Sequence, residues 1–123
     1  MSDAKQKILV VDDDAVVSEA IQEVLRRNGF EVISASNGQE ALDLIEKGVP
    51  DAIILDRRMP VMDGNETLKR LRADEKTKFV PVVMLTGDYE VEQVIESMEL
   101  GANEYVVKSD ALDDIVTRLQ VTI

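Results

Sequence analysis

Five short apolar runs alternate with five longer segments of helical periodicity, and this alternation limits the folds that the chain can adopt. The runs are too short for helices and are rich in Val and Ile, which favours β-strands. Strands are predicted at Lys7–Val11, Glu31–Ala35, Ala52–Leu55, Val80–Leu85 and Glu104–Val107. The first predicted helix has an apolar face that runs from Val16 to Leu25 and ends at the stop signal Asn28-Gly29. The other helices are predicted at Gln39–Lys47, Asn65–Ala73, Glu90–Leu100 and Ala111–Gln120. Because strands that alternate with helices pair in parallel through right-handed crossovers, we predict an α/β fold with a five-stranded parallel sheet and five helices on both faces.

The composition excludes several classes of function. Acidic residues outnumber basic ones 25 to 14, and the net charge of −11 argues against attraction to nucleic acid or to an anionic membrane. No apolar run approaches the roughly 20 residues that span a bilayer, and the polar N-terminus lacks the apolar core of a signal peptide. The chain has neither Cys nor His, so its chemistry must use oxygen ligands and amines. We predict one cytoplasmic domain over residues 1–123, with a core of about 7–119.

Polar residues stand at the ends of four predicted strands. Asp12 and Asp13 follow the first strand, Asp56 the third, Thr86 the fourth and Lys108 the fifth. In an open parallel sheet, ligands bind outside the carboxyl ends of the strands. With strand order 2-1-3-4-5, Asp56 would lie between the two acids on one side and the other two residues on the opposite side. We therefore predict that these five residues form one site.

The predicted cluster of carboxylates favours metal binding and phosphoryl transfer. Two unit charges about 4 Å apart repel by roughly 4 kcal/mol at an effective dielectric constant near 20, and a divalent cation relieves that repulsion. With oxygen ligands alone, the expected ion is Mg²⁺, with Mn²⁺ or Ca²⁺ as substitutes. A cation beside a free carboxylate, a hydroxyl and a lysine suits attack of Asp56 on phosphorus, which would give an aspartyl phosphate.

These residues also have purely structural explanations. An Asp that precedes a helix can cap it, which applies to Asp12, Asp13 and Asp14, and Asp56 can bond the backbone of a turn. Thr is common at strand ends, and a lysine is usually solvated. By pattern alone, core packing is the expected role of Tyr105, Met59, Met62, Met84 and Met98.

Four sets of residues in combination resemble the receiver domain of two-component response regulators, over about Lys7 to Leu119. They are Val10-Val11-Asp12-Asp13, Leu55-Asp56 with Met59-Pro60 and Met62-Asp63-Gly64, Leu85-Thr86-Gly87, and Tyr105-Val106-Val107-Lys108. The resemblance implies a flavodoxin-like, doubly wound sheet with the strand order given above. It also implies a phosphoacceptor signalling domain rather than an enzyme, which assists its own phosphoryl transfer and slow autodephosphorylation.

The resemblance assigns the phosphoacceptor and the metal ligands. It implies that Asp56 accepts the phosphoryl group from the phosphohistidine of a histidine kinase or of a phosphotransfer protein. Asp12 and Asp13 would bind Mg²⁺ together with Asp56 and the backbone carbonyl of Arg58.

The remaining roles follow from the same resemblance. Thr86 and Lys108 would contact the phosphoryl oxygens, and Tyr105 would be the aromatic switch that turns inward when Thr86 moves toward the phosphate. Arg58 and Asp88 occupy positions that tune how fast water removes the phosphoryl group. An output protein or domain is expected to bind through the fourth helix, the fifth strand and the fifth helix.

One residue departs from the family pattern. Receiver domains usually carry a proline after the lysine, often with a cis peptide bond, whereas Ser109 follows Lys108 here. A cis bond before a residue other than proline costs about 2.5–4 kcal/mol, so we expect a trans peptide at this position. We predict that Lys108 still reaches the phosphoryl site.

Part of the sequence is also consistent with two other functions. The run from Ile8 to Val16, with Asp12, Asp13 and Asp14, also resembles the first motif of haloacid-dehalogenase-like phosphatases, in which Asp12 would be the nucleophile. That interpretation leaves Asp56 and its loop unexplained. The second alternative is an interaction module on the same fold that works without phosphorylation. Because the chain ends at Ile123, it is expected to be either a stand-alone receiver or a piece of a longer regulator.

Overall fold

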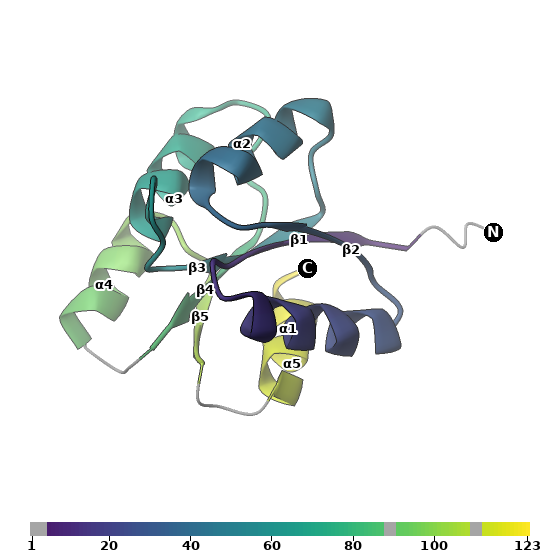
Figure 1. Ribbon diagram of the computed structural model, residues 1–123. Coiled ribbons are helices and arrows are strands. Elements are labelled where there is room, and N and C mark those ends of the chain that lie inside the picture. The colour runs from purple at the N-terminus through teal and green to yellow at the C-terminus, as the bar shows by residue number, and fades with distance from the viewer. Residues whose placement is uncertain (1–4, 88–90, 109–111) are drawn as a thin grey trace.

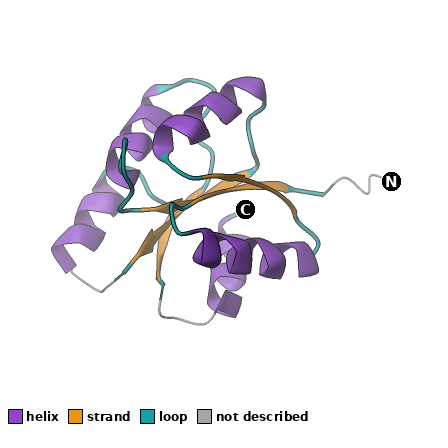
Figure 2. Ribbon diagram, viewed as in Figure 1, coloured by secondary structure: helices purple, strands orange, loops and turns teal. Residues whose placement is uncertain are grey.

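The computed structural model describes residues 5–87, 91–108 and 112–123, and within these ranges five strands alternate with five helices (Figures 1 and 2). The strands are β1 Lys7–Val11, β2 Glu31–Ala35, β3 Ala52–Asp56, β4 Val82–Thr86 and β5 Glu104–Val107. The helices are α1 Ala15–Arg27, α2 Gly38–Lys47, α3 Gly64–Ala73, α4 Val91–Glu99 and α5 Leu112–Thr122. All four strand pairs are parallel, and the order is β2-β1-β3-β4-β5, so the predicted fold is confirmed.

The helices cover both faces of the sheet (Figure 1). One apolar core lies under α1 and α5 and contains Ile8, Ile54, Leu25 and Leu119. A second core lies between the opposite face of the sheet and α2 and α3. The central strands β3 and β4 are buried at every position, whereas the outer strand β2 is largely accessible, as its alternating sequence predicts. None of the described helices has the length and the apolar character that crossing a membrane requires.

Of the two helices that follow β4, α4 is less buried than α5 among the described residues. Ser97 is its one fully buried residue, and Val91, Ile95 and Met98 on its outer side are 69%, 51% and 41% exposed. The prediction that Met98 fills the core is therefore wrong, although Met62 and Met84 are buried as expected. A helix with so little buried apolar surface is weakly held by packing.

The loop from β3 to α3 contains a strained residue. Val61 has a φ of 70° and is 82% exposed, so a β-branched side chain adopts the left-handed region without any gain from burial. We expect Val61→Asn to raise the free energy of unfolding by about 1 kcal/mol, because Asn tolerates this conformation. Urea unfolding checks this value. The matched control is Val49→Asn, at an exposed valine that has no positive φ; an equal effect at both positions would contradict the strain.

Candidate functional site

Strand β3 carries Asp56 to the rim of the sheet. Asp56 is the last residue of the strand, is paired with Leu85 of β4 and is only 3% exposed. The chain then turns sharply, because the Gly64 amide donates to the Arg57 carbonyl over 2.9 Å. A Cβ at position 64 would overlap the Asp56 carbonyl, so only glycine lets α3 begin this close to the strand. The turn therefore fixes the backbone on which the Asp56 carboxylate stands.

The end of β1 supplies two further carboxylates. Asp12 is 3% exposed, and its Oδ1 accepts from the Asp14 amide over 2.9 Å, while Asp13 is exposed. Asp14 accepts from the amides of Val16 and Val17 and caps α1, so the capping role falls on Asp14 rather than on its two neighbours. Ligand oxygens of Asp12, Asp13 and Asp56 all lie within 4.8 Å of one another. The three acids therefore converge, as the strand order predicts.

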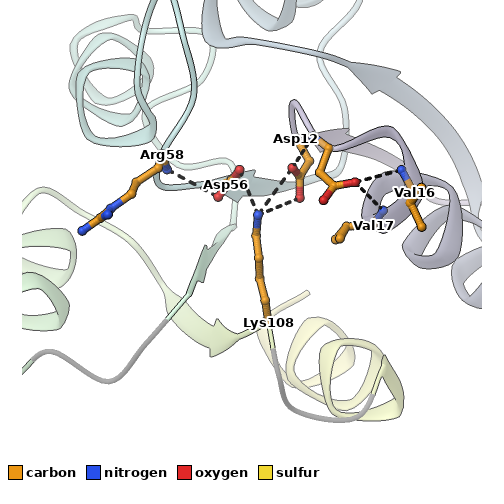
Figure 3. A network of polar contacts seen from close by, with 7 residues as sticks. Asp12, Val16, Val17, Asp56, Arg58 and Lys108 are labelled. Carbon is orange, nitrogen blue, oxygen red and sulfur yellow. Dashed lines mark hydrogen bonds and ion pairs between the residues drawn. The ribbon is translucent and has the colours of Figure 1, made fainter.

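Lys108 reaches this carboxylate cluster from the end of β5 (Figure 3). Its Nζ lies 3.0 Å from Asp56 Oδ2 and 3.3 Å from Asp12 Oδ2, so the ammonium sits between the two buried carboxylates. The Lys108 amide donates to the Thr86 carbonyl over 2.8 Å, which fixes the backbone beside the site. Lys108 thus reaches Asp56 although Ser109 follows it. The Lys108–Ser109 peptide itself lies outside the described residues.

The pKa values of Asp56 and Lys108 are both raised, for different physical reasons. Burial, and then the nearby Asp12 carboxylate, raise the pKa of Asp56 to about 7 in spite of the positive charge of Lys108. Burial alone would lower the pKa of Lys108, but the negative charges of Asp56 and Asp12 outweigh it and raise that pKa. Lys108 therefore stays protonated, while Asp56 titrates near neutral pH.

The donor set suits a hard divalent cation. The three carboxylates offer oxygen ligands at one point, and one ammonium compensates for part of their charge. The buried Oδ2 atoms of Asp12 and Asp56 accept no hydrogen bond from the described residues; their contact with Lys108 is an ion pair. An ion with oxygen ligands, such as Mg²⁺, would complete the coordination of these atoms. The residues present therefore fit the cation that the sequence predicts.

The other predicted site residues that the structure describes lie on β4, on β5 and in the loop after β3. Thr86 ends β4 and is buried, and half-buried Tyr105 lines a small cavity together with Thr86. The Arg58 amide approaches Asp56 Oδ1 at 3.4 Å, while its side chain extends away from Asp56 (Figure 3). Asp88 lies outside the described residues, so its predicted role in tuning the removal of the phosphoryl group stays a prediction.

Two residues between β3 and α3 received no role from the sequence. Asp63 caps α3 by accepting from the Glu66 amide over 2.9 Å, and its spacing from Glu66 is a helix-start signal that identifies it. Arg57 follows Asp56 and has a buried Nε atom. No local pattern indicates where its side chain lies, because that depends on the packing of α4.

Comparison with known proteins identifies the family that the sequence motifs resemble. The family model described as the response regulator receiver domain matches residues 8–120. The response regulator MprA of Mycolicibacterium vanbaalenii is 39% identical over 114 residues, which cover 93% of this chain and 48% of MprA. The chain thus spans about half the length of the curated relatives that it matches.

Solved structures agree with the sequence comparison. The chemotaxis protein CheY4 of Vibrio cholerae has a TM-score of 0.92 and 35% identity, over 98% of this chain and all 100% of that chain. The receiver domain of the sensor histidine kinase PA1611 of Pseudomonas aeruginosa has a TM-score of 0.88 and 31% identity, over 97% of this chain and 98% of that domain. That domain was solved with a magnesium ion coordinated in its active-site cleft.

Receiver domains are phosphoacceptors in two-component signalling, bind Mg²⁺ in an acidic site, and interact with histidine kinases and output domains. The carboxylate cluster at the rim of this sheet has the charge, the ligand type and the position that such a domain requires. By fold, by sequence and by the composition of its site, the chain belongs to the response regulator receiver domains.

Proposed function

We propose that Asp56 is the phosphoacceptor of this receiver domain and that Asp12, Asp13, Asp56 and the Arg58 carbonyl hold Mg²⁺. The observation that carries the proposal is the convergence of three carboxylates within 4.8 Å, with the Lys108 ammonium 3.0 Å from Asp56. Mg²⁺, when bound, neutralises charge on the phosphoryl oxygens and on the carboxylates.

In the proposed reaction, one Asp56 carboxylate oxygen attacks phosphorus in line with the bond to the donor histidine. The new O–P bond forms as the P–N bond breaks, and its electron pair returns to the imidazole of the kinase or phosphotransfer protein. The Lys108 ammonium leaves its ion pair with the Asp56 carboxylate and pairs with a phosphoryl oxygen. The Thr86 hydroxyl donates a hydrogen bond to another phosphoryl oxygen. Slow attack by water reverses the modification, at a rate that Arg58 and Asp88 tune.

The signal is proposed to pass from the phosphoryl group to α4, β5 and α5. Thr86 and Tyr105 line one cavity beneath α4, which supports a coupled movement in which Tyr105 turns inward as Thr86 moves toward the phosphate. The binding surface for an output protein or domain would include the exposed apolar side of α4 formed by Val91, Ile95 and Met98. Phosphorylation would then shift the population toward the arrangement that binds the output partner.

Three further proposals concern the extent of the domain, the compartment in which it works and the metals that it accepts. We propose that residues 7–119 form the core of a single domain that works in the cytoplasm, without direct contact to nucleic acid or membrane. Mn²⁺ or Ca²⁺ is proposed to substitute for Mg²⁺, because both accept carboxylate and carbonyl oxygens.

Phosphate labelling tests the proposed function. The protein is incubated with acetyl phosphate and Mg²⁺, and the acyl phosphate is located by mass spectrometry after reduction with borohydride. We expect one modification, on Asp56, that disappears when Mg²⁺ is chelated. Modification of Asp12 would support the phosphatase alternative, and absence of labelling together with failure to bind beryllofluoride would support the interaction module.

The binding of Mg²⁺ is expected to depend on pH through Asp56. Since the pKa of Asp56 is about 7 without the ion, a proton competes with Mg²⁺ below that pH. The association constant should rise about tenfold per pH unit below 7 and level off above it. Calorimetric titrations across this range check the slope. In Asp56→Asn the dependence near pH 7 should vanish; a wild-type affinity that is flat from pH 5.5 to 8 (about 1.5 units below to 1 above the pKa) would contradict the assignment.

A further inference from the structure

A small cavity lies between the sheet and the N-terminal half of α4. It is lined by Arg57, Thr86, Gln93, Ser97, Tyr105 and two apolar side chains, and its volume is about 10 Å³. We call it the α4 cavity. One water molecule needs about this much space, together with two to four polar partners.

Two residues of this lining carry complementary polar atoms that have no partner in the described part of the chain. Arg57 Nε, a donor, and Gln93 Oε1, an acceptor, are both buried and form no hydrogen bond with the described residues. A guanidinium group cannot shed its proton, so Arg57 Nε–H stays a donor at any physiological pH. Buried donors and acceptors are nearly always satisfied, by protein or by ordered water. Because Arg57 and Gln93 line one cavity of this size, a single water there can serve both the donor and the acceptor.

The rest of α4 shows why a bridge at this point matters. At its C-terminal end, Ser97 Oγ donates to Asn65 Oδ1 over 3.2 Å, and the Gly101 carbonyl in the next loop accepts from Arg72 Nε over 3.0 Å. Asn65 Nδ2 also donates to Glu96 Oε1 over 3.1 Å. The N-terminal half has no such bond to the body of the protein among the described residues, and Val91 and Ile95 are exposed. A contact through Gln93 would hold the end of the helix that is otherwise least anchored.

We propose that one buried water, bound between Arg57 Nε–H and Gln93 Oε1, ties α4 to the end of β3 and stabilises the resting arrangement of the domain. This inference rests on the proposed function, because it needs Tyr105 to enter the α4 cavity on phosphorylation. Entry of the ring displaces the water, and displacement of a well-ordered water without replacement of its hydrogen bonds opposes the change. Arg57 and Gln93 are thus positioning residues that set how much phosphorylation is needed to release α4.

A high-resolution crystal structure of the protein without a phosphoryl analogue tests the bridge directly. We expect one ordered water within hydrogen-bond distance of Arg57 Nε and Gln93 Oε1. A second structure with Mg²⁺ and beryllofluoride should show Tyr105 in that place. Absence of the water from a well-ordered cavity in the first structure would overturn the inference.

A double-mutant cycle tests the effect on the switch. Gln93→Met keeps the length of the side chain but removes the acceptor, and Arg57→Lys keeps the positive charge but removes the Nε–H. Each single variant should bind beryllofluoride about fivefold more tightly in the presence of Mg²⁺, which corresponds to about 1 kcal/mol. Because both changes break the same bridge, the double variant should also gain about fivefold rather than about 25-fold.

The controls separate this inference from the proposed function. Gln120→Met makes the same exchange at an exposed position of α5 and should leave the affinity unchanged. If wild-type protein does not bind beryllofluoride, or binds it without movement of Tyr105, the proposed switch fails. If wild type switches while the single variants keep wild-type affinity, or the cycle is additive, only the bridge fails.

Discussion

Asp56→Asn is expected to abolish phosphorylation by acetyl phosphate and, at the same time, to stabilise the protein in the presence of a chelator. The loss follows because an amide oxygen is a poor nucleophile toward phosphorus and forms no acyl phosphate. The gain follows because burial and Asp12 raise the pKa of Asp56 from 3.8 to about 7, so the ionised carboxylate destabilises the fold above pH 7. We expect the free energy of unfolding to rise by roughly 2–4 kcal/mol at pH 8.

The raised pKa of Asp56 determines how the stability of the wild type changes with pH. The unfolded chain loses its Asp56 proton near pH 4, while the folded protein retains it up to about pH 7, so the wild type loses stability between these values. The advantage of Asp56→Asn should therefore be absent near pH 4 and complete above pH 7. Denaturant unfolding of both proteins at several pH values measures it. Asp43→Asn, at an exposed acid of α2, is the control and should change neither labelling nor stability by much. Equal stability of wild type and Asp56→Asn at pH 8 would refute the electrostatic account.

Lys108→Ala is expected to separate metal binding from phosphoryl transfer. The ammonium lies 3.0 Å from Asp56 and 3.3 Å from Asp12, so it repels a divalent cation that binds the same carboxylates. Its removal should tighten Mg²⁺ binding roughly tenfold. The same removal deprives the phosphoryl oxygens of a fixed positive charge in the transition state, and the rate of phosphorylation should fall by about 10²–10³. Calorimetry and stopped-flow phosphorylation measure the two effects.

The opposite signs distinguish this account from general damage to the fold. A variant that merely unfolds the loop after β5 would lose both Mg²⁺ affinity and phosphorylation. Lys69→Ala removes an exposed lysine from α3 and should leave both quantities unchanged. Unchanged phosphorylation and unchanged signalling in Lys108→Ala would show that Lys108 does not serve the phosphoryl site.

The strands were predictable because their residues are buried on both faces or alternate in a simple way. β1, β2 and β5 have the predicted bounds, whereas β3 and β4 extend one residue further, to Asp56 and Thr86. Polar residues end an apolar run in the sequence, yet the backbone of Asp56 continues the ladder of the sheet. β4 begins at Val82, after Pro81, which has no amide to donate to its neighbour.

The helix starts depended on side chains that periodicity does not detect. α2 and α3 each begin one residue earlier than predicted, at Gly38 and Gly64. In both cases a cap precedes the glycine: Asn37 accepts from the Glu40 amide, and Asp63 accepts from the Glu66 amide. Apolar periodicity identifies the buried side of a helix, but the capping residue determines where the helix begins.

The carboxylate cluster was predictable for a topological reason, and its surroundings were not. The carboxyl ends of parallel strands meet at one rim, so the strand order alone brings Asp12, Asp13 and Asp56 together. Lys108 follows β5 at the same rim, as predicted, but no pattern in the sequence indicates that its ammonium lies between the carboxylates of Asp12 and Asp56. The burial of Arg57 Nε depends on how α4 packs beside β4 and β5, which no local pattern in the sequence encodes.

A crystal structure with Mg²⁺ and beryllofluoride would test the central claim most directly. We expect one cation with carboxylate oxygens of Asp12, Asp13 and Asp56 and the Arg58 carbonyl oxygen in its coordination shell, at the roughly 2.0–2.1 Å typical of Mg²⁺. The beryllium should be bonded to an Asp56 oxygen, with Lys108 Nζ turned toward a fluoride. A cation bound elsewhere, or beryllofluoride on Asp12 with Asp56 left bare, would contradict the account.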